Sequence, residues 1–147
     1  MAAVRTAEVT WEGDLLSGNG VVTAGTSGLF KRLPVSWATR TEASGGKTSP
    51  EELLASAHAS CYAMALSAGL ARAGTPPKKL EVSVAVTFDK VEAGWRVTSS
   101  TIKVKGTVPG ADDAAFKKAA EGAKDGCPIS QALKGNVALS VEATLAK

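Results

Sequence analysis

The stretch Ser49-Pro50-Glu51-Glu52 is typical of a helix start, and the fold is best predicted outward from it. Ser49 suits the N-cap, and Pro50 suits the first helical position, where its missing N–H needs no partner. Glu52 falls three residues after the N-cap, where its carboxylate can bond back to the N–H of Ser49 and complete a capping box. Because Glu52 takes this structural role, Glu51 is the carboxylate that could pair with a cation.

The predicted helix ends at Gly74, with Pro76 and Pro77 beyond it. It is therefore roughly 24 residues long, or about 36 Å, which is enough to cross a domain. Eight alanines lie between Ala55 and Ala73, so neighbouring backbones can approach closely. We expect this helix at the centre of the fold, where it could also meet its own copy in a dimer.

The same helix has no Asp, Glu, Lys or Arg from Leu53 to Ala71, which is about the length that crosses a bilayer. Its residues are mostly Ala and Ser, which gain little from lipid, so we expect a buried helix rather than a membrane span. The first residues lack an apolar run of signal-peptide length, which predicts a cytoplasmic protein. The net charge of +3 is mild and scattered, which argues against nucleic acid as a partner.

Alternating apolar and polar residues predict strands on both sides of the helix. Before it, residues 8–11 and 20–23 predict a hairpin, and residues 33–39 predict a third strand. After it, the pattern predicts strands at 80–88, 95–108 and 137–145 and short helices at 112–124 and about 126–135. The chain has no repeat and no interior linker, so we predict a single α+β domain over residues 1–147.

The two cysteines, Cys61 and Cys127, are candidates for thiol chemistry. They form no CxxC pair, and with a single histidine in the chain a metal site is not expected. Cys61 lies mid-helix in uncharged surroundings, where a thiol has a raised pKa unless a cation comes from elsewhere in the fold. Cys127 precedes Pro128 at a predicted helix start, which favours a thiolate. The residues alone leave two readings open, namely two inert thiols or a redox pair.

Three further residues could belong to a site. Arg40 closes the predicted third strand, which leads into the loop before the helix, and Glu51 is free to pair with a cation. His58 lies one helical turn before Cys61, a spacing that would permit a cysteine hydrolase with a Cys–His pair. A dimer that binds a small apolar ligand without catalysis is another function that the residues leave open.

Two motifs resemble those of the OsmC/Ohr family of osmotically inducible and organic hydroperoxide resistance proteins. The first is Ser49-Pro50-Glu51-Glu52-Leu53-Leu54 followed by Ala57-His58-Ala59-Ser60-Cys61, and the second is Cys127-Pro128-Ile129-Ser130-Gln131-Ala132-Leu133. The segments Trp11-Glu12-Gly13-Asp14 and Thr39-Arg40-Thr41-Glu42 are similar to the OsmC branch in particular. Thr41 departs from the pattern, because an aromatic residue is expected there, and this loosens one predicted wall of the substrate pocket.

The resemblance implies an interlocked α+β homodimer in which a long central helix packs on antiparallel β-sheets. It implies a cysteine-based peroxidase that reduces organic hydroperoxides, and hydrogen peroxide more weakly, with no bound cofactor or metal. Cys61 would be the peroxidatic cysteine and Cys127 the resolving one in an intrasubunit disulfide, with Arg40 and Glu51 activating the thiol. An external dithiol, of lipoyl type or a small molecule, would act as the reductant.

Glu51 and Cys61 are ten residues apart on the predicted helix, which places them about 15 Å apart along its axis and about 80° apart around it. Arg40 would have to contact both the Glu51 carboxylate and the Cys61 sulfur, and within one chain it would bridge this distance poorly. Two copies of the helix packed antiparallel would bring the start of one near the middle of the other. We therefore expect either a composite site, with Glu51 supplied by the partner subunit, or a break in the helix.

Overall fold

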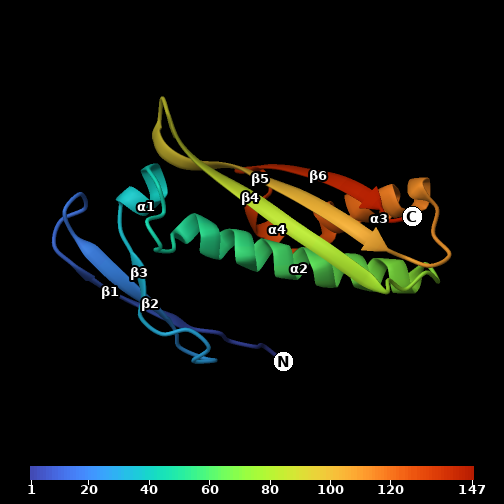
Figure 1. Ribbon diagram of the computed structural model, residues 1–147, viewed down its shortest axis with the longest axis horizontal. Coiled ribbons are helices and arrows are strands. Elements are labelled where there is room, and N and C mark those ends of the chain that lie inside the picture. Colours follow the sequence, from blue (N-terminus) through green and yellow to red (C-terminus); the bar gives the residue numbers. More distant parts are fainter. The chain divides into compact units, whose positions relative to one another are not determined.

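The computed structural model describes all of residues 1–147 (Figure 1). The chain forms two compact units, residues 1–50 and residues 51–147. The first contains strands β1 (Ala7–Glu12), β2 (Asn19–Ala24) and β3 (Leu33–Val35) and helix α1 (Ala38–Thr41). Helix α2 (Pro50–Arg72) begins at the boundary, and the second unit continues with β4 (Lys79–Val91), β5 (Gly94–Thr107), α3 (Asp113–Gly126), α4 (Pro128–Leu133) and β6 (Ala138–Leu145). The assignment of the whole chain to a single domain stays a prediction.

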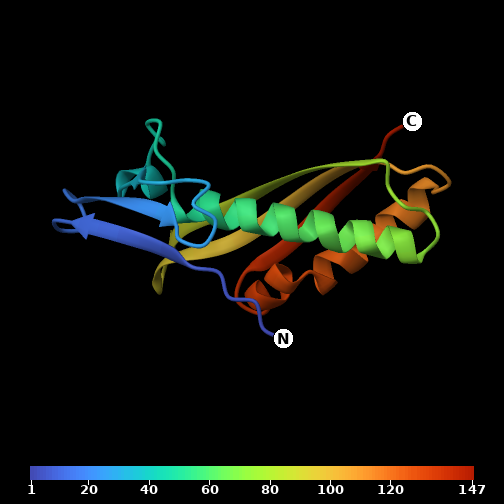
Figure 2. The same cartoon turned by 90° about the horizontal axis from the view of Figure 1, so that it is seen from below.

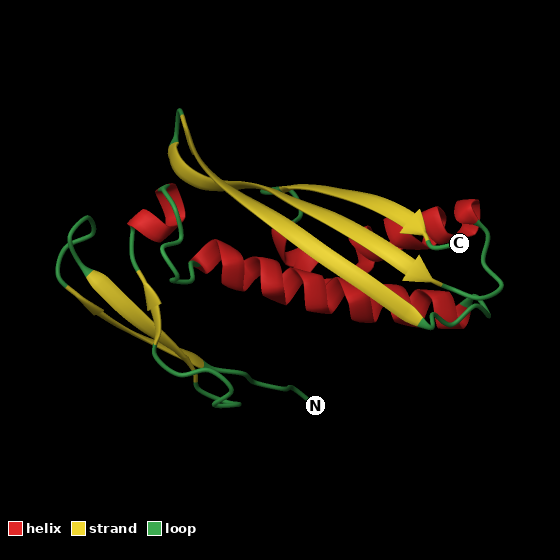
Figure 3. Cartoon of the chain, in the orientation of Figure 1, coloured by secondary structure: helices red, strands yellow, loops and turns green.

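The first unit is built on an antiparallel sheet in the order β1-β2-β3 (Figure 3). The hairpin of β1 and β2 confirms the sequence prediction, and its register runs from Ala7 opposite Ala24 to Glu12 opposite Asn19. Asp14 shapes the turn, because its carboxylate accepts hydrogen bonds from the backbone of Leu16 and from the backbone and hydroxyl of Ser17. Such Asx turns satisfy backbone N–H groups locally.

The predicted third strand is too long. Strand β3 ends at Val35, and the chain then turns into the short helix α1. The hydroxyl of Thr39 donates to the carbonyl of Ser36 at 2.7 Å and accepts from the N–H of Ser36, which draws this backbone away from sheet pairing. Arg40 therefore lies on a helix rather than at the end of a strand.

The second unit contains a mixed sheet in the order β4-β5-β6. Strands β4 and β5 form a long antiparallel hairpin, whereas β6 runs parallel to β5, from Ser99 opposite Ala138 to Gly106 opposite Leu145. The expectation of purely antiparallel sheets is therefore wrong for this sheet. The reason is the crossover through α3 and α4, which carries the chain back before β6 begins, as a parallel connection requires.

Helices α2, α3 and α4 cover one face of this sheet (Figures 1 and 2). From His58 onward the buried residues of α2 recur every four residues, at His58, Tyr62, Leu66 and Leu70. On β5, Ile102 faces the helices and is completely buried, while Lys103 faces away from them and is exposed. By length and composition α2 could cross a membrane, but its buried face belongs to the core of this unit.

Helix α3 begins where the sequence predicts, with the Asp112 carboxylate accepting from the N–H of Ala115 as an N-cap. Cys127 ends α3 and is also the N-cap of α4, which confirms the predicted helix start at Pro128. Phe116 of α3 is completely buried against Gly106 of β5, where a Cβ atom on the glycine would lie 2.5 Å from the ring. The helix layer thus packs tightly on the sheet at this point.

Candidate functional site

The two cysteine sulfurs lie 2.9 Å apart, with the thiol of Cys127 donating to the sulfur of Cys61. Cys61 is in the middle of α2, and Cys127 is at the junction of α3 and α4. The contact between the sulfurs therefore connects α2 to this junction. Both cysteines are free thiols. A disulfide bond is about 2.0 Å long, so a movement of about 1 Å separates this contact from a covalent bond.

The exposure of the two sulfurs differs. Cys61 is partly exposed, whereas Cys127 is completely buried beneath it. A solute that reaches the pair therefore meets Cys61 first.

The surroundings of Cys61 oppose its ionisation. Burial raises the pKa of the Cys61 thiol, and the neighbouring Cys127 raises it further, while a hydrogen bond from the backbone of Ile129 lowers it in part. The net direction is upward, so Cys61 is a thiol at neutral pH within this unit. This agrees with the expectation that a reactive thiolate needs a cation from elsewhere in the fold.

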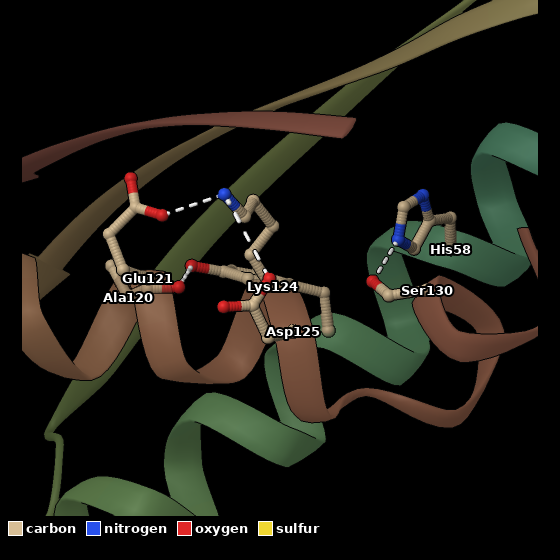
Figure 4. Close-up of polar contacts among 7 residues, drawn as sticks. His58, Ala120, Glu121, Lys124, Asp125 and Ser130 are labelled. Atoms are coloured by element: carbon tan, nitrogen blue, oxygen red, sulfur yellow. Dashed lines mark hydrogen bonds and ion pairs between the residues drawn. The ribbon is translucent and has the colours of Figure 1, made fainter. Parts of the chain in front are cut away.

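His58 does not serve Cys61 as a base. Its Nδ1 lies 2.7 Å from the hydroxyl of Ser100 on β5. Its Nε2 lies 2.7 Å from the hydroxyl of Ser130 on α4, as Figure 4 shows. Burial lowers the pKa of His58, so the ring is neutral at neutral pH. Because both ring nitrogens bond to serines, the Cys–His pair required by a hydrolase is not formed.

The two buried partners of His58, Ser100 and Ser130, are residues that the sequence analysis did not single out. They lie 42 and 72 residues from His58. Ser130 stands in the second cysteine motif, but no local pattern pairs either serine with His58. The sequence signal that could have identified them is their position next to apolar residues. Ser100 lies two residues before Ile102 on β5, and Ser130 directly follows Ile129 on α4. Both face the core, where a polar side chain requires a partner.

Arg40 and Glu51 lie on different elements. Arg40 is on α1 in the first unit, with its guanidinium carbon 5.5 Å from the centre of the Trp37 ring, a cation–π arrangement. Glu51 is in the first turn of α2 and is only 8% exposed. Since α2 is continuous from Pro50 to Arg72, the alternative of a helix break between Glu51 and Cys61 is wrong. The roles of Arg40 and Glu51 stay predictions.

An open groove of about 600 Å³ runs between α2 and α3. Alanine and glycine residues line most of it, and Arg72 and Lys118 are its charged residues. It includes Ala65, one turn after Cys61, and Gly126, which precedes Cys127. No three His, Cys, Asp or Glu side chains come together in a way that could hold a metal ion.

A pair of thiols in contact, one partly exposed and one buried, defines a candidate dithiol redox site. A sequence model of the family described as OsmC-like protein matches residues 43–142. Peroxiredoxin OsmC of Escherichia coli (strain K12) is 39% identical over 142 residues, which cover 97% of this chain and 98% of that protein. The chain therefore belongs to the OsmC-like family, as its motifs predicted.

More distant relatives agree with this assignment. An organic hydroperoxide resistance protein of Xanthomonas axonopodis pv. citri is 28% identical over 96 residues, 65% of this chain and 66% of that protein. The crystal structure of the organic hydroperoxide resistance protein OhrB of Bacillus subtilis has a TM-score of 0.74 at 25% identity, covering 95% of this chain and 98% of that one. The OsmC-like protein of Mycoplasma pneumoniae has the same fold, with a TM-score of 0.74 at 14% identity and complete coverage of both chains.

Proposed function

We propose that this protein is a thiol-dependent peroxidase that reduces organic hydroperoxides through Cys61 and Cys127. The observation that carries the proposal is the 2.9 Å contact between the two sulfurs. The names of the relatives, a peroxiredoxin and organic hydroperoxide resistance proteins, support a redox function related to peroxides.

In the first step, the Cys61 thiolate attacks one oxygen of the hydroperoxide. An S–O bond forms and the O–O bond breaks, so the peroxide is reduced by two electrons and Cys61 becomes a sulfenic acid. The departing alkoxide takes up a proton and leaves as the alcohol. The partial exposure of Cys61 supports its role in this step, because the buried Cys127 is less accessible to a peroxide.

In the second step, the Cys127 thiol condenses with the sulfenic acid of Cys61. The S–S bond forms, the S–O bond breaks, and water leaves. An external dithiol, of lipoyl type or a small molecule, then reduces this intrasubunit disulfide by thiol exchange and is itself oxidised. No bound cofactor or metal takes part in these steps.

The first step needs a thiolate and a group that stabilises the departing alkoxide. The raised pKa of Cys61 means that its own unit does not supply the thiolate at neutral pH. Arg40 is always charged and presents several donors, so it can stabilise both charges. Glu51 can hold its guanidinium by a bidentate contact.

The proposal includes an interlocked homodimer in which Glu51 of one subunit serves Cys61 of the other. Two features support this arrangement. Helix α2 is unbroken, so Glu51 and Cys61 of one chain are about 15 Å apart along its axis. Several large apolar side chains are also exposed in the single chain, including Trp11 at 39% and Met64 at 67%.

The proposal is tested by counting free thiols before and after one equivalent of cumene hydroperoxide. The native protein should lose two thiols per chain, with the denatured protein still migrating as a monomer. Cys61→Ser should lose none and have no turnover, whereas Cys127→Ser should consume about one equivalent and then stall or over-oxidise. Multiple turnovers by Cys61→Ser would show that the assignment is wrong.

A further inference from the structure

We propose that His58 is a positioning residue that ties helix α4 to helix α2 and thereby holds Cys127 within bonding distance of the oxidised Cys61. The inference rests on the proposed function, because it concerns the step in which the disulfide forms. It goes beyond that function by assigning a role to a residue outside the reacting groups.

His58 and Ser130 lie one helical turn from the two reacting sulfurs. His58 precedes Cys61 by three residues on α2, and Ser130 follows Cys127 by three residues on α4. The His58–Ser130 hydrogen bond of 2.7 Å (Figure 4) therefore lies one helical turn from the 2.9 Å contact between the sulfurs. Both contacts join α2 to the first turn of α4 or its N-cap. The hydrogen bond is therefore placed to keep the two sulfurs close together.

The hydrogen bond is shielded from water. His58 is 0% exposed and Ser130 is 1% exposed. Water does not compete for either group, and an unpaired polar atom at this depth would be costly. The link therefore keeps the two helices together rather than exchanging with solvent.

Oxidation of Cys61 changes the other polar contacts of α4. The thiol of Cys127 donates to the Cys61 sulfur, and the backbone of Ile129 also bonds to that sulfur. Both contacts involve the atom that acquires an oxygen in the first step, so both must rearrange. The His58–Ser130 bond involves neither sulfur and can persist through the reaction.

The imidazole suits this place because its two nitrogens lie on opposite sides of a rigid ring. A neutral ring has one N–H donor and one acceptor, and each serine hydroxyl can complement either one. Ser100 on β5 lies at Nδ1, and Ser130 on α4 lies at Nε2. Only the bond to Ser130 connects the ring to α4, and the packing around the buried ring holds it in place without Ser100.

The two serines provide a matched pair of variants. Both are buried, and each makes one 2.7 Å bond to the same ring. Ser130→Ala removes the link to α4, while Ser100→Ala removes a hydroxyl of equal burial and leaves the link to α4 in place. His58→Asn removes the two-ended bridge itself.

The experiment measures two rates in single-turnover mixing with cumene hydroperoxide. Sulfenate formation is followed by trapping with dimedone, and disulfide formation by mass spectrometry after quenching. Ser130→Ala should form the sulfenate within about twofold of the native rate, but form the disulfide about 10- to 100-fold more slowly, since a misplacement of about 1 Å can have such an effect. His58→Asn should behave like Ser130→Ala, and Ser100→Ala should change the second rate by less than about threefold.

A purely structural role would give a different result. It would lower the thermal midpoint in both serine variants and leave the ratio of the two rates unchanged. Native rates of disulfide formation in Ser130→Ala would overturn the proposal, and so would equal slowing by both serine variants. If His58→Asn fails to fold, the two serine variants decide the question.

A second oxidant separates this inference from the proposed function. Diamide, an azo compound, oxidises two thiols to a disulfide and is reduced to a hydrazine, with no peroxide involved. If cumene hydroperoxide leaves the native thiols unchanged, the proposed function fails. The inference still stands if diamide closes the disulfide faster in the native protein than in Ser130→Ala, and it fails if the two rates are equal.

Discussion

Cys61 lies in the middle of α2 with its sulfur against that of Cys127, and both burial and this neighbour raise its pKa. The environment that places the Cys127 sulfur against Cys61 is therefore also the one that opposes a thiolate at Cys61. A peroxidase built on this pair must restore the thiolate with a cation. In the proposed mechanism that cation is Arg40.

Replacing Arg40 by alanine is expected to raise the pKa of Cys61 and to slow sulfenate formation by about 10- to 100-fold, because charge stabilisation of this kind contributes a few kcal/mol to such steps. The condensation with Cys127 should keep its rate. The pKa is measured from the pH dependence of alkylation by iodoacetamide, and the rate by stopped flow. Arg32→Ala, an exposed arginine of the same unit, is the control. An unchanged rate of sulfenate formation in Arg40→Ala would reject this role.

The lowered pKa of His58 has a consequence for stability. Its ordinary value is 6.5, and burial lowers it in the folded protein. Below about pH 6.5 the unfolded chain binds a proton that the folded chain does not, so the free energy of unfolding falls as the pH drops from 6.5 toward the folded pKa. The limiting slope is about 1.4 kcal/mol per pH unit.

Because the chain has a single histidine, His58→Asn should remove this slope between pH 7 and pH 5. Urea unfolding of the two proteins at several pH values measures it. The lowered pKa values of Asp14 and Glu81 act below their ordinary values of 3.8 and 4.5 and therefore leave this window untouched. Equal slopes in both proteins would contradict the neutral state of the ring.

Residues of the site differ in how far they can be predicted. Cys61 and Cys127 stand in local motifs, so the sequence alone identifies them as candidates. The bonds of His58 to Ser100 and Ser130 depend on tertiary packing across 42 and 72 residues. His58 and Cys61 do lie one turn apart on a helix, as their spacing predicted. The two nitrogens of the His58 ring, however, bond to the buried serines and not to Cys61.

At the scale of elements, periodic segments were predicted well and the irregular one was not. Helix α2 and the long hairpin of β4 and β5 follow from capping residues and from alternation over many positions. The strand prediction failed after β3 because the hydroxyl of Thr39 bonds to the backbone of Ser36. Such a side-chain bond competes with strand pairing, and the alternation of apolar and polar residues gives no sign of it. The parallel pairing of β6 follows from the crossover through α3 and α4, which only the three-dimensional arrangement shows.

Gly106→Ala tests the packing of α3 on the sheet. The added methyl group would lie 2.5 Å from the buried ring of Phe116, so we expect a loss of about 2 kcal/mol in the free energy of unfolding. Gly122→Ala on α3 is the matched control, since nothing lies within 4 Å of its added Cβ atom. Alanine there should be neutral or stabilise the helix by up to about 1 kcal/mol. Chemical denaturation measures both, and a neutral Gly106→Ala would contradict this packing.

At the scale of the whole molecule, the proposed composite site requires two chains. We expect Glu51→Ala and Cys61→Ser to be inactive alone and to regain one functional site when their subunits mix, because the mixed dimer combines Cys61 of one chain with Glu51 of the other. Peroxidase activity is measured after subunit exchange has been verified by native mass spectrometry. The absence of regained activity in a verified mixed dimer would exclude the composite site.

The contact between Cys61 and Cys127 spans 66 residues of chain, nearly half of the molecule. A covalent bond at this place removes conformational entropy from the unfolded chain, by an amount equivalent to about 4 kcal/mol at 25 °C. For a chain of this size the thermal midpoint should rise by about 10 °C on oxidation, and Cys127→Ser should show no such rise. Calorimetry of the reduced and oxidised forms measures the difference. In the proposed mechanism each cycle alternates between a loosely and a tightly constrained chain, so that resistance to heat becomes a readout of redox state.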